Sequence, residues 1–295
     1  QHAFVSTLAE RFPAAAAQRV VLVTDTREEA EAWAAETLLV DSVTSVSAPE
    51  AVNEAWRVDV QVEHATGTAV VEALRDDRPD GSHLVTGADA RTVDFGASLA
   101  RGAPWAALVI ALGTIVLLFL MTGSLVVPLK ALLASVLSLG ASLGVLVWGF
   151  QDGHFAPLMG FHPDDVLGVD TLVLVLTLVF GFGLAMDYEM FILSRITEQV
   201  ERGVPDTEAI ALGIQRSGRI ITSAALIIVV VFAGFATGDL MVIKQLGTAL
   251  AVAVLLDATL VRCLLVPAFM TWQRRIMWWA PRPLKHLHAR FGLRD

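Results

Sequence analysis

The chain has 295 residues, of which 55% belong to the set AVILMFWYC and only 17% are charged, and its mean hydropathy is +0.63. This composition excludes a disordered chain, and the single cysteine, Cys263, excludes a scaffold held by intramolecular disulfides. The net charge of −9 is the opposite of the basic balance that nucleic-acid phosphates require, so we expect no nucleic-acid partner. A composition this apolar is typical of a membrane protein.

The acidic charge is confined to one part of the chain. Residues 1–101 hold 8 Arg and 17 Asp or Glu, whereas residues 102–295 hold 13 residues of each sign. We therefore predict three parts: a solvated domain over 1–101, a transmembrane domain over 102–270, and a basic, aromatic tail over 271–295.

Short apolar or alternating segments in the first part predict strands over 19–24, 40–47, 56–63 and 83–86. Two helices are predicted between them: one runs to Leu38 behind the capping-box pattern of Thr26 and Glu29, and the other covers 67–78. The resulting order, strand, helix, strand, strand, helix, strand, is that of a ferredoxin-like α+β fold, βαββαβ.

Five apolar segments follow, and each reaches the ~20 residues needed to cross ~30 Å of hydrocarbon. They cover 103–127, 129–150, 171–194, 218–238 and 245–270. The sequence thus predicts a bundle of five transmembrane helices. The segment 198–215, which has apolar residues at intervals, is expected to form a helix lying on the cytoplasmic face.

The charges between the spans predict the orientation of the chain, because cytoplasmic loops carry an excess of Lys and Arg. Lys130 is assigned to the hinge between the first two spans, and the 195–219 loop and the tail are basic, whereas 151–170 has four Asp and no Lys or Arg. This places the C-terminus in the cytoplasm and residues 1–101 outside a cell membrane. An outside domain needs an upstream signal or span, so a chain that starts at Gln1 is expected to be a fragment.

Ionisable residues inside spans are the candidates for function, because a charge at the bilayer centre costs roughly 2.5–3.5 kcal/mol on insertion scales. Asp187 lies near the end of the third span beside Tyr188, the only tyrosine in the chain. A carboxylate in apolar surroundings can exchange a proton near neutrality, and the phenol can donate a hydrogen bond to its charged form. The alternative is an interfacial Asp187 that is satisfied by water or by Arg195. Gly181, Gly183 and Ala185 would let a neighbouring helix approach closely.

Asp257 and Arg262 lie in the fifth span. A separation of five residues is roughly 140° around an α-helix, so we expect each to find a partner on another helix, or Arg262 to extend to the membrane surface. Ser223, in the fourth span, is a candidate for polar support, with Thr222 beside it, although such hydroxyls more commonly bond back to their own helix.

Other patterns are weaker. Two intramembrane aspartates raise the alternative of an aspartyl protease, but such enzymes place Gly-x-Gly directly before the aspartate, whereas Leu184-Ala-Met186 intervenes here. His154 and His162 do not have metal-site spacing relative to Asp164 and Asp165. Aromatic and basic residues in the tail are typical of an anchor at the inner leaflet, namely Trp272, Trp278, Trp279, Arg274, Arg275 and Arg282.

The stretch Gly183-Leu-Ala-Met-Asp-Tyr-Glu-Met-Phe-Ile-Leu-Ser-Arg195 resembles the MmpL-type branch of the RND transporter superfamily. The resemblance continues through the later motifs, which are Ser223-Ala-Ala-Leu-Ile227, Ile243-Lys-Gln-Leu-Gly247, Leu256-Asp-Ala-Thr-Leu-Val-Arg262 with Pro267-Ala268, and Trp278-Trp279-Ala280-Pro281. In the first domain it rests mainly on element order.

The resemblance implies a protein built of two similar halves, of which this chain corresponds to the C-terminal half without its opening span. It implies export of lipids or other amphiphiles driven by the proton gradient, with no cofactor and no enzymatic activity. The proton relay would include Asp187 and Tyr188, supported by Asp257 and Arg262, while Glu189 is given no role. The implied partners are the bilayer, an amphiphilic substrate, and a missing N-terminal half with a matching Asp-Tyr pair. A sterol-sensing type of receptor or a non-transporting scaffold is the competing interpretation.

Overall fold

A computed structural model describes residues 19–63, 66–77, 83–162, 168–272 and 278–292. The chain divides into two compact units, Gln1–Ala106 and Ala107–Asp295. Each unit is described by itself.

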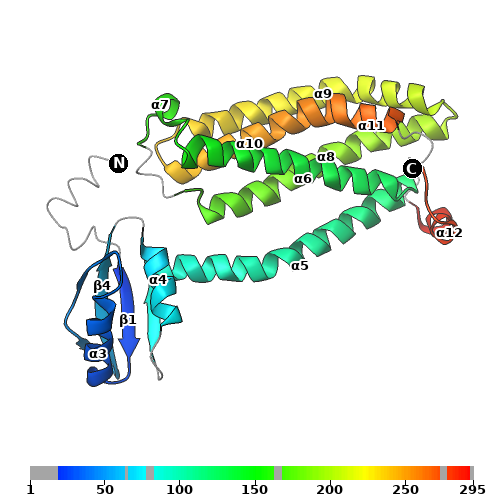
Figure 1. Cartoon of the computed structure of the whole chain (residues 1–295). Helices are drawn as coiled ribbons and strands as arrows, with labels where there is room; N and C mark the ends of the chain where they lie inside the picture. Colours follow the sequence, from blue (N-terminus) through cyan, green and yellow to red (C-terminus); the bar gives the residue numbers. More distant parts are fainter. Residues whose placement is uncertain (1–18, 64–65, 78–82, 163–167, 273–277, 293–295) are drawn as a thin grey trace. The chain divides into compact units, whose positions relative to one another are not determined.

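The first unit contains an antiparallel sheet with the strand order β2–β4–β1–β5, and a short strand β3 pairs with β4 (Figure 1). This order confirms the predicted ferredoxin-like arrangement. Its elements, in chain order, are β1 (Arg19–Thr24), α3 (Arg27–Thr37), β2 (Val43–Val46), β3 (Glu50–Val52), β4 (Ala55–Val62), α4 (Gly67–Asp76) and β5 (Leu84–Gly87).

Strand β3 was not predicted. Val52 pairs with Ala55, so the hairpin turns over two residues, and the first of them, Asn53, has a φ of 56°. Asparagine tolerates this left-handed conformation better than most residues, but the Asn-Glu pair lacks the Gly that usually marks such a turn in a sequence.

The predicted period-two patterns produce the core of this unit. Val20 and Leu22 of β1 and Val58 and Val60 of β4 are buried, and they pack in one cluster with Trp33 and other residues of α3 and α4. The capping box is confirmed, because Thr26 Oγ1 accepts from Glu29 N at 3.3 Å and Glu29 Oε2 accepts from Thr26 N at 3.2 Å.

Five helices of the described chain are long and apolar enough to cross a membrane, as predicted. Four of these five helices pack against one another and form the bundle of the second unit, namely α6, α8, α9 and α10 (Figure 1). The elements are α5 (Ala88–Thr122), α6 (Val126–Leu146) continued by η1 (Val147–Gln151), α7 (Ala156–Met159), α8 (Thr171–Glu201), α9 (Asp206–Ala236), α10 (Met241–Leu256) continued by η3 (Asp257–Leu265) and α11 (Val266–Trp272), and α12 (Arg282–Phe291).

Two boundaries differ from the prediction. No separate surface helix covers 198–215, because α8 continues to Glu201 and α9 begins at Asp206. The break between the first two spans lies at residues 123–125, where Gly123 has a φ of 66° and Ser124 Oγ accepts from Val126 N at 3.1 Å. Lys130 therefore lies inside α6 and is buried, and its assignment to a hinge was wrong.

Polar side chains and glycines hold the bundle together, as is usual where lipid removes the hydrophobic drive between helices. Ser142 Oγ donates to Ala249 O at 2.6 Å, which joins α6 to α10. A Cβ added at Gly247 would lie 2.6 Å from Phe232 O, so α10 and α9 approach closely there. Many apolar side chains of the spans remain exposed, among them Leu226 and Val230, which suits a lipid-facing surface.

Candidate proton-relay site

Asp257 and Arg262 form an ion pair inside a single element. Arg262 Nε donates to Asp257 Oδ2 at 2.8 Å, and Arg262 Nη2 donates to the same oxygen. We predicted that these residues would not pair, and that prediction was wrong. The helix widens at this point into the π-helix η3, in which Val266 N bonds Val261 O, five residues back. The i→i+5 pattern brings side chains five residues apart onto nearly the same face.

Arg262 also connects η3 to α8. Its Nη2 donates to Ala185 O at 2.9 Å, and its guanidinium carbon lies 4.7 Å from the centroid of the Tyr188 ring. Only 3% of Arg262 is exposed, so the alternative in which it extends to the membrane surface was wrong. The carboxylate, the carbonyl and the aromatic face partly compensate the buried guanidinium for the loss of water, while its Nη1 has no hydrogen-bond partner among the described residues.

Asp187 and Tyr188 point to different sides of α8. Tyr188 packs into the bundle against Arg262, whereas Asp187 is exposed on the face that it shares with Gly183, Met190 and Ser194. Arg195 does not neutralise Asp187 in this arrangement, because it pairs with Glu198 at 3.1 Å. Asp187 therefore presents an exposed carboxylate on a helix whose N-terminal half is apolar.

Of the small residues near Asp187, Gly181 and Ala185 behave as predicted. A Cβ added at Gly181 would lie 2.6 Å from Leu139 Cδ2 of α6, and Ala185 is buried beneath Arg262. Gly183 differs, since no described atom lies within 4 Å of the added Cβ. Gly183 lies on the same exposed face of α8 as Asp187.

Ser223 is exposed on α9, and the hydrogen bonds found among the described residues include none from its hydroxyl to this cluster. Its supporting role stays a prediction. Thr222 bonds back to Gly218 O of its own helix at 2.7 Å, which is the common arrangement for a hydroxyl in a span.

A second buried ion pair was missed by the sequence reasoning. Lys130 Nζ of α6 lies 3.3 Å from Glu189 Oε1 of α8, and the two side chains are 8% and 6% exposed. The available signal was a charged residue inside each apolar span. Lys130 had been counted as a loop charge, and Glu189 had been set aside in favour of the neighbouring Asp-Tyr pair.

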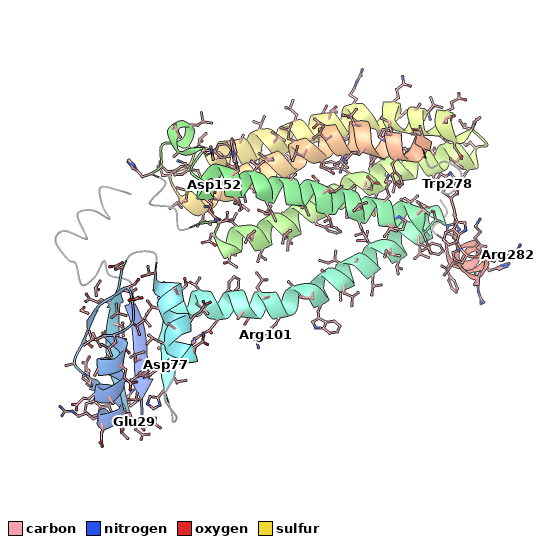
Figure 2. The ribbon with its side chains drawn as sticks, in the orientation of Figure 1. Glu29, Asp77, Arg101, Asp152, Trp278 and Arg282 are labelled. Carbon is pink, nitrogen blue, oxygen red and sulfur yellow. The ribbon has the colours of Figure 1, made fainter. Side chains whose placement is uncertain are left out.

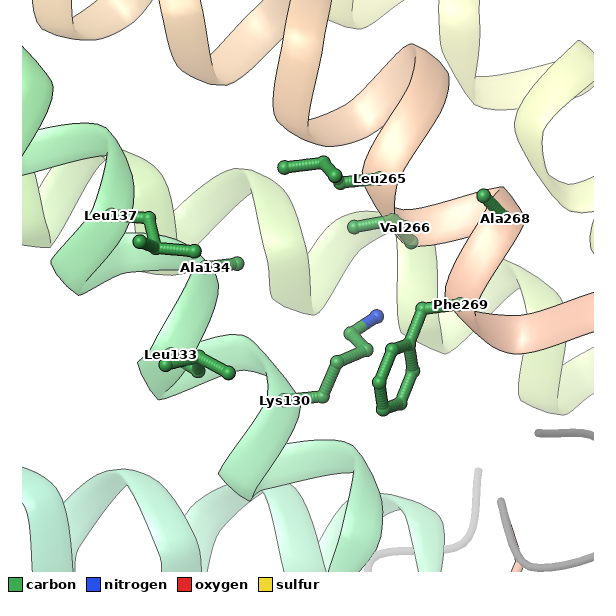
Figure 3. Close-up of a pocket in the computed structure, with 8 residues that line it drawn as sticks. All are labelled: Lys130, Leu133, Ala134, Leu137, Leu265, Val266, Ala268 and Phe269. Atoms are coloured by element: carbon green, nitrogen blue, oxygen red, sulfur yellow. The ribbon is translucent and has the colours of Figure 1, made fainter. Parts of the chain in front are cut away.

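Lys130 also borders a cavity of about 370 Å³ between α6 and the end of the last span (Figure 3). The rest of its lining is apolar and comprises Leu133, Ala134, Leu137, Leu265, Val266, Ala268 and Phe269. A much smaller space, of about 10 Å³, adjoins Asp257, Tyr188 and Ser138. It is about large enough for one water molecule.

The remaining motif residues have structural contacts. Lys244 Nζ donates to Met159 O at 2.6 Å, and Gln245 bonds both Asp170 N and Gly168 O, so the start of α10 holds the preceding loop. His154 stacks on Trp148 with the ring centroids 4.5 Å apart. Among the described residues, no group of three His, Cys, Asp or Glu side chains is placed to hold a metal ion.

The described part of the tail packs near the break between α5 and α6. Leu125 N donates to Trp279 O at 3.2 Å, and the His288 ring of α12 contacts Phe119 edge-on. Trp278 and Arg282 lie at one end of the bundle and Asp152 at the other (Figure 2). Arg274 and Arg275, which the anchor prediction included, lie outside the described residues, as do Asp164 and Asp165.

Comparison with known proteins agrees with the resemblance. Residues 15–291 match the model of the MMPL family. Membrane protein SCO6666 of Streptomyces coelicolor is 50% identical over 77% of this chain and 32% of its own length. The trehalose monomycolate exporter MmpL3 of Mycobacterium tuberculosis is 44% identical over 71% of this chain and 22% of its own length. The mycolic acid-containing lipids exporter MmpL11 of Mycolicibacterium smegmatis is 40% identical over 67% of this chain and 20% of its own length.

The chain thus spans a third or less of the length of these relatives. The family model nevertheless covers almost the whole chain, including the five apolar helices and the motifs around Asp187 and Asp257. The chain belongs to the MMPL family.

Proposed function

We propose that this chain is the C-terminal half of an exporter that uses the proton gradient to move lipids or other amphiphiles, with Asp187 and Tyr188 in its proton relay. The observation that carries the proposal is the position of Asp187, an exposed carboxylate in a spanning helix, next in sequence to Tyr188, whose ring packs against the buried Arg262–Asp257 pair. No cofactor is needed, because the energy comes from the gradient.

The exposure of Asp187 supports a partner outside this chain. A carboxylate on a spanning helix is costly to expose to lipid and is better placed against protein or water. We propose that the face of Gly183, Asp187 and Met190 meets the N-terminal half of the complete protein, where a second Asp-Tyr pair would supply the matching groups. In the same proposal, residues 1–101 lie outside the membrane and the C-terminus lies in the cytoplasm.

The substrate class comes from the relatives. Two of them are named as exporters of trehalose monomycolate and of mycolic acid-containing lipids, which are acylated amphiphiles. We extend only the class, lipid or amphiphile, to this chain.

The mechanism has three steps. Protons from outside reach Asp187 and neutralise it, and the neutral side chain no longer attracts its partner. The spans then change their packing. Helix α5 is continuous from Ala88 to Thr122, so a movement of the spans can be transmitted along it to the solvated unit. The solvated unit then passes the substrate onward.

Two other functions have less support. An aspartyl protease needs two cooperating carboxylates, whereas Asp257 is engaged by Arg262 and Asp187 lies exposed on α8. A sterol-sensing type of receptor or a scaffold would share the helices but would not need a proton gradient.

The test uses the complete polypeptide in cells and in proteoliposomes. Asp187→Asn should fold and reach the membrane but lose export, because Asn cannot be protonated. Glu201→Gln, which removes an exposed acid at the end of the same helix, is the matched control and should export normally. Export by Asp187→Asn, or export that persists after the proton gradient is collapsed, would refute the proposal.

A further inference from the structure

The two buried ion pairs of the membrane unit differ in what they connect. Asp257 and Arg262 both belong to η3, so their charge pair lies within one element. Lys130 and Glu189 belong to α6 and α8, so their attraction holds two spanning helices together. Neutralising one member of the second pair would remove an attraction between two spanning helices.

The Lys130–Glu189 pair is also held less firmly than the other. Among the described residues, neither Lys130 Nζ nor Glu189 Oε1 has a hydrogen-bond partner, although both are buried. Arg262, by contrast, donates to both Asp257 and Ala185, and only its Nη1 is without a partner among the described residues. A buried ion pair without additional hydrogen bonds adds little stability compared with apolar residues of the same size. Stability alone does not account for its presence.

The second pair adjoins the relay. Glu189 follows Tyr188, and it lies one helical turn after Ala185, whose carbonyl accepts from Arg262. Arg262 in turn pairs with Asp257, so both ion pairs contact neighbouring turns of α8. The two buried ion pairs are thus neighbours along α8.

The charged groups of the surrounding elements are paired elsewhere or exposed: Asp257 and Arg262 of η3 pair with each other, and Asp187 of α8 is exposed. Lys130 is the only charged residue of α6. Arg216 and Arg219 of α9 are exposed, Arg195 and Arg202 of α8 pair with Glu198, and Lys244 of α10 bonds Met159 O.

We propose that Glu189 is a proton-binding residue of the relay and that its ion pair with Lys130 is the proton-sensitive connection between α6 and α8. An O–H bond forms on the Glu189 carboxylate with a proton from the gradient. The neutral acid no longer attracts the Lys130 ammonium, and α6 separates from α8. The inference rests on the proposed proton-driven function and specifies which helices respond.

The experiment compares two double variants of the complete protein in vesicles of phosphatidylethanolamine and phosphatidylglycerol. Lys130→Met/Glu189→Gln removes the buried pair without leaving one charge alone, so it should fold. Glu198→Gln/Arg202→Gln removes an exposed pair on the same helix and is the control. Infrared difference spectra follow the carbonyl band of protonated carboxylic acids as the pH falls. Spin labels at the exposed positions Val136 of α6 and Val179 of α8, in a cysteine-free background, report the distance between the helices.

The wild type and the control should show a pH-dependent carboxylic acid band and a pH-dependent distance between the labels. The buried-pair variant should lose the part of the band that comes from Glu189 and should show no pH-dependent change of distance. Its proton flux, followed with a dye trapped in the vesicles, should fall roughly a hundredfold, the lower end of what a positioned proton-transfer group contributes. A buried-pair variant with the wild-type band, distance change and flux would overturn the inference.

The variant Asp187→Asn distinguishes a failure of this inference from a failure of the proposed function. That variant should lose flux and keep the distance change that depends on Glu189. Conversely, a Glu189-dependent distance change in a protein without proton-driven export would refute the proposed function and leave the proton-sensitive connection standing.

Discussion

Arg262 and Asp257 are paired although five residues separate them, because the last spanning helix widens into a π-helix at Asp257. In an α-helix the two side chains would point roughly 140° apart. The pairing also directs Arg262 toward Ala185 and Tyr188 of α8, so the backbone irregularity is what assembles the cluster.

The first prediction concerns this pair. Replacing either partner alone, as in Asp257→Leu or Arg262→Leu, should lower the free energy of unfolding by about 3–5 kcal/mol, because a buried charge is left uncompensated. The double variant Asp257→Leu/Arg262→Leu should recover most of that loss. Unfolding of the complete protein in mixed detergent micelles measures the three values. Equal losses in the single and double variants would contradict a coupled pair.

The second prediction separates the ring of Tyr188 from its hydroxyl. Tyr188→Phe keeps the aromatic face against Arg262 and should leave stability nearly unchanged, while export falls if the hydroxyl takes part in the relay. Tyr188→Leu removes the face as well and should cost about 0.5–2 kcal/mol of stability, the range of a cation–π contact. Equal stability of the two variants would show that the ring contact contributes nothing.

The third prediction concerns helix packing. Gly247→Ala brings a Cβ to 2.6 Å from the backbone oxygen of Phe232, so α10 must move away from α9, at a cost of about 1–3 kcal/mol. Gly140→Ala, on α6, meets no atom within 4 Å and should not destabilise the protein, because Ala favours the helix over Gly by about 0.5–1 kcal/mol. Thermal unfolding of the two purified variants makes the comparison, which fails if both behave alike.

The fourth prediction concerns the solvated unit. Thr26→Ala removes the hydroxyl that accepts from Glu29 N and should destabilise the start of α3 by about 1 kcal/mol. Hydrogen exchange of the α3 amides in the complete protein should then be faster by about fivefold, whereas Thr26→Ser should exchange at the wild-type rate. Unchanged exchange in Thr26→Ala would mean that the cap does not support the helix.

The elements could be predicted where a local signal was strong. The alternation of Trp56, Val58, Val60 and Val62 defined β4 and its buried face, and the five apolar stretches defined the five spans. The Asn53 hairpin was missed because Asn-Glu lacks the usual turn glycine, whereas the break at Gly123 was placed a few residues too late although Gly is a common helix stop signal.

The candidate site was predictable in its membership but not in its arrangement. Asp187, Tyr188, Asp257 and Arg262 stand out because ionisable and phenolic groups are rare in spans. Their faces could not be derived, since the periodicity of an ideal α-helix was applied to a segment that is a π-helix. Lys130 and Glu189 were overlooked for a related reason: only the packing of α6 on α8 brings them within 3.3 Å.

The uneven distribution of charge separates a solvated part from a membrane part, because the excess of acidic residues lies in 1–101 and the apolar spans follow it. Composition and periodicity by themselves determined the class of protein, the order of the elements and the rare polar residues of the spans, since these depend only on local chemistry and on burial in a medium without water. The tertiary structure alone decided which charges neutralise one another. Pairing depends on helix rotation, on the π-helical turn after Asp257 and on distances of a few ångströms between helices, and these are set by packing across the whole bundle.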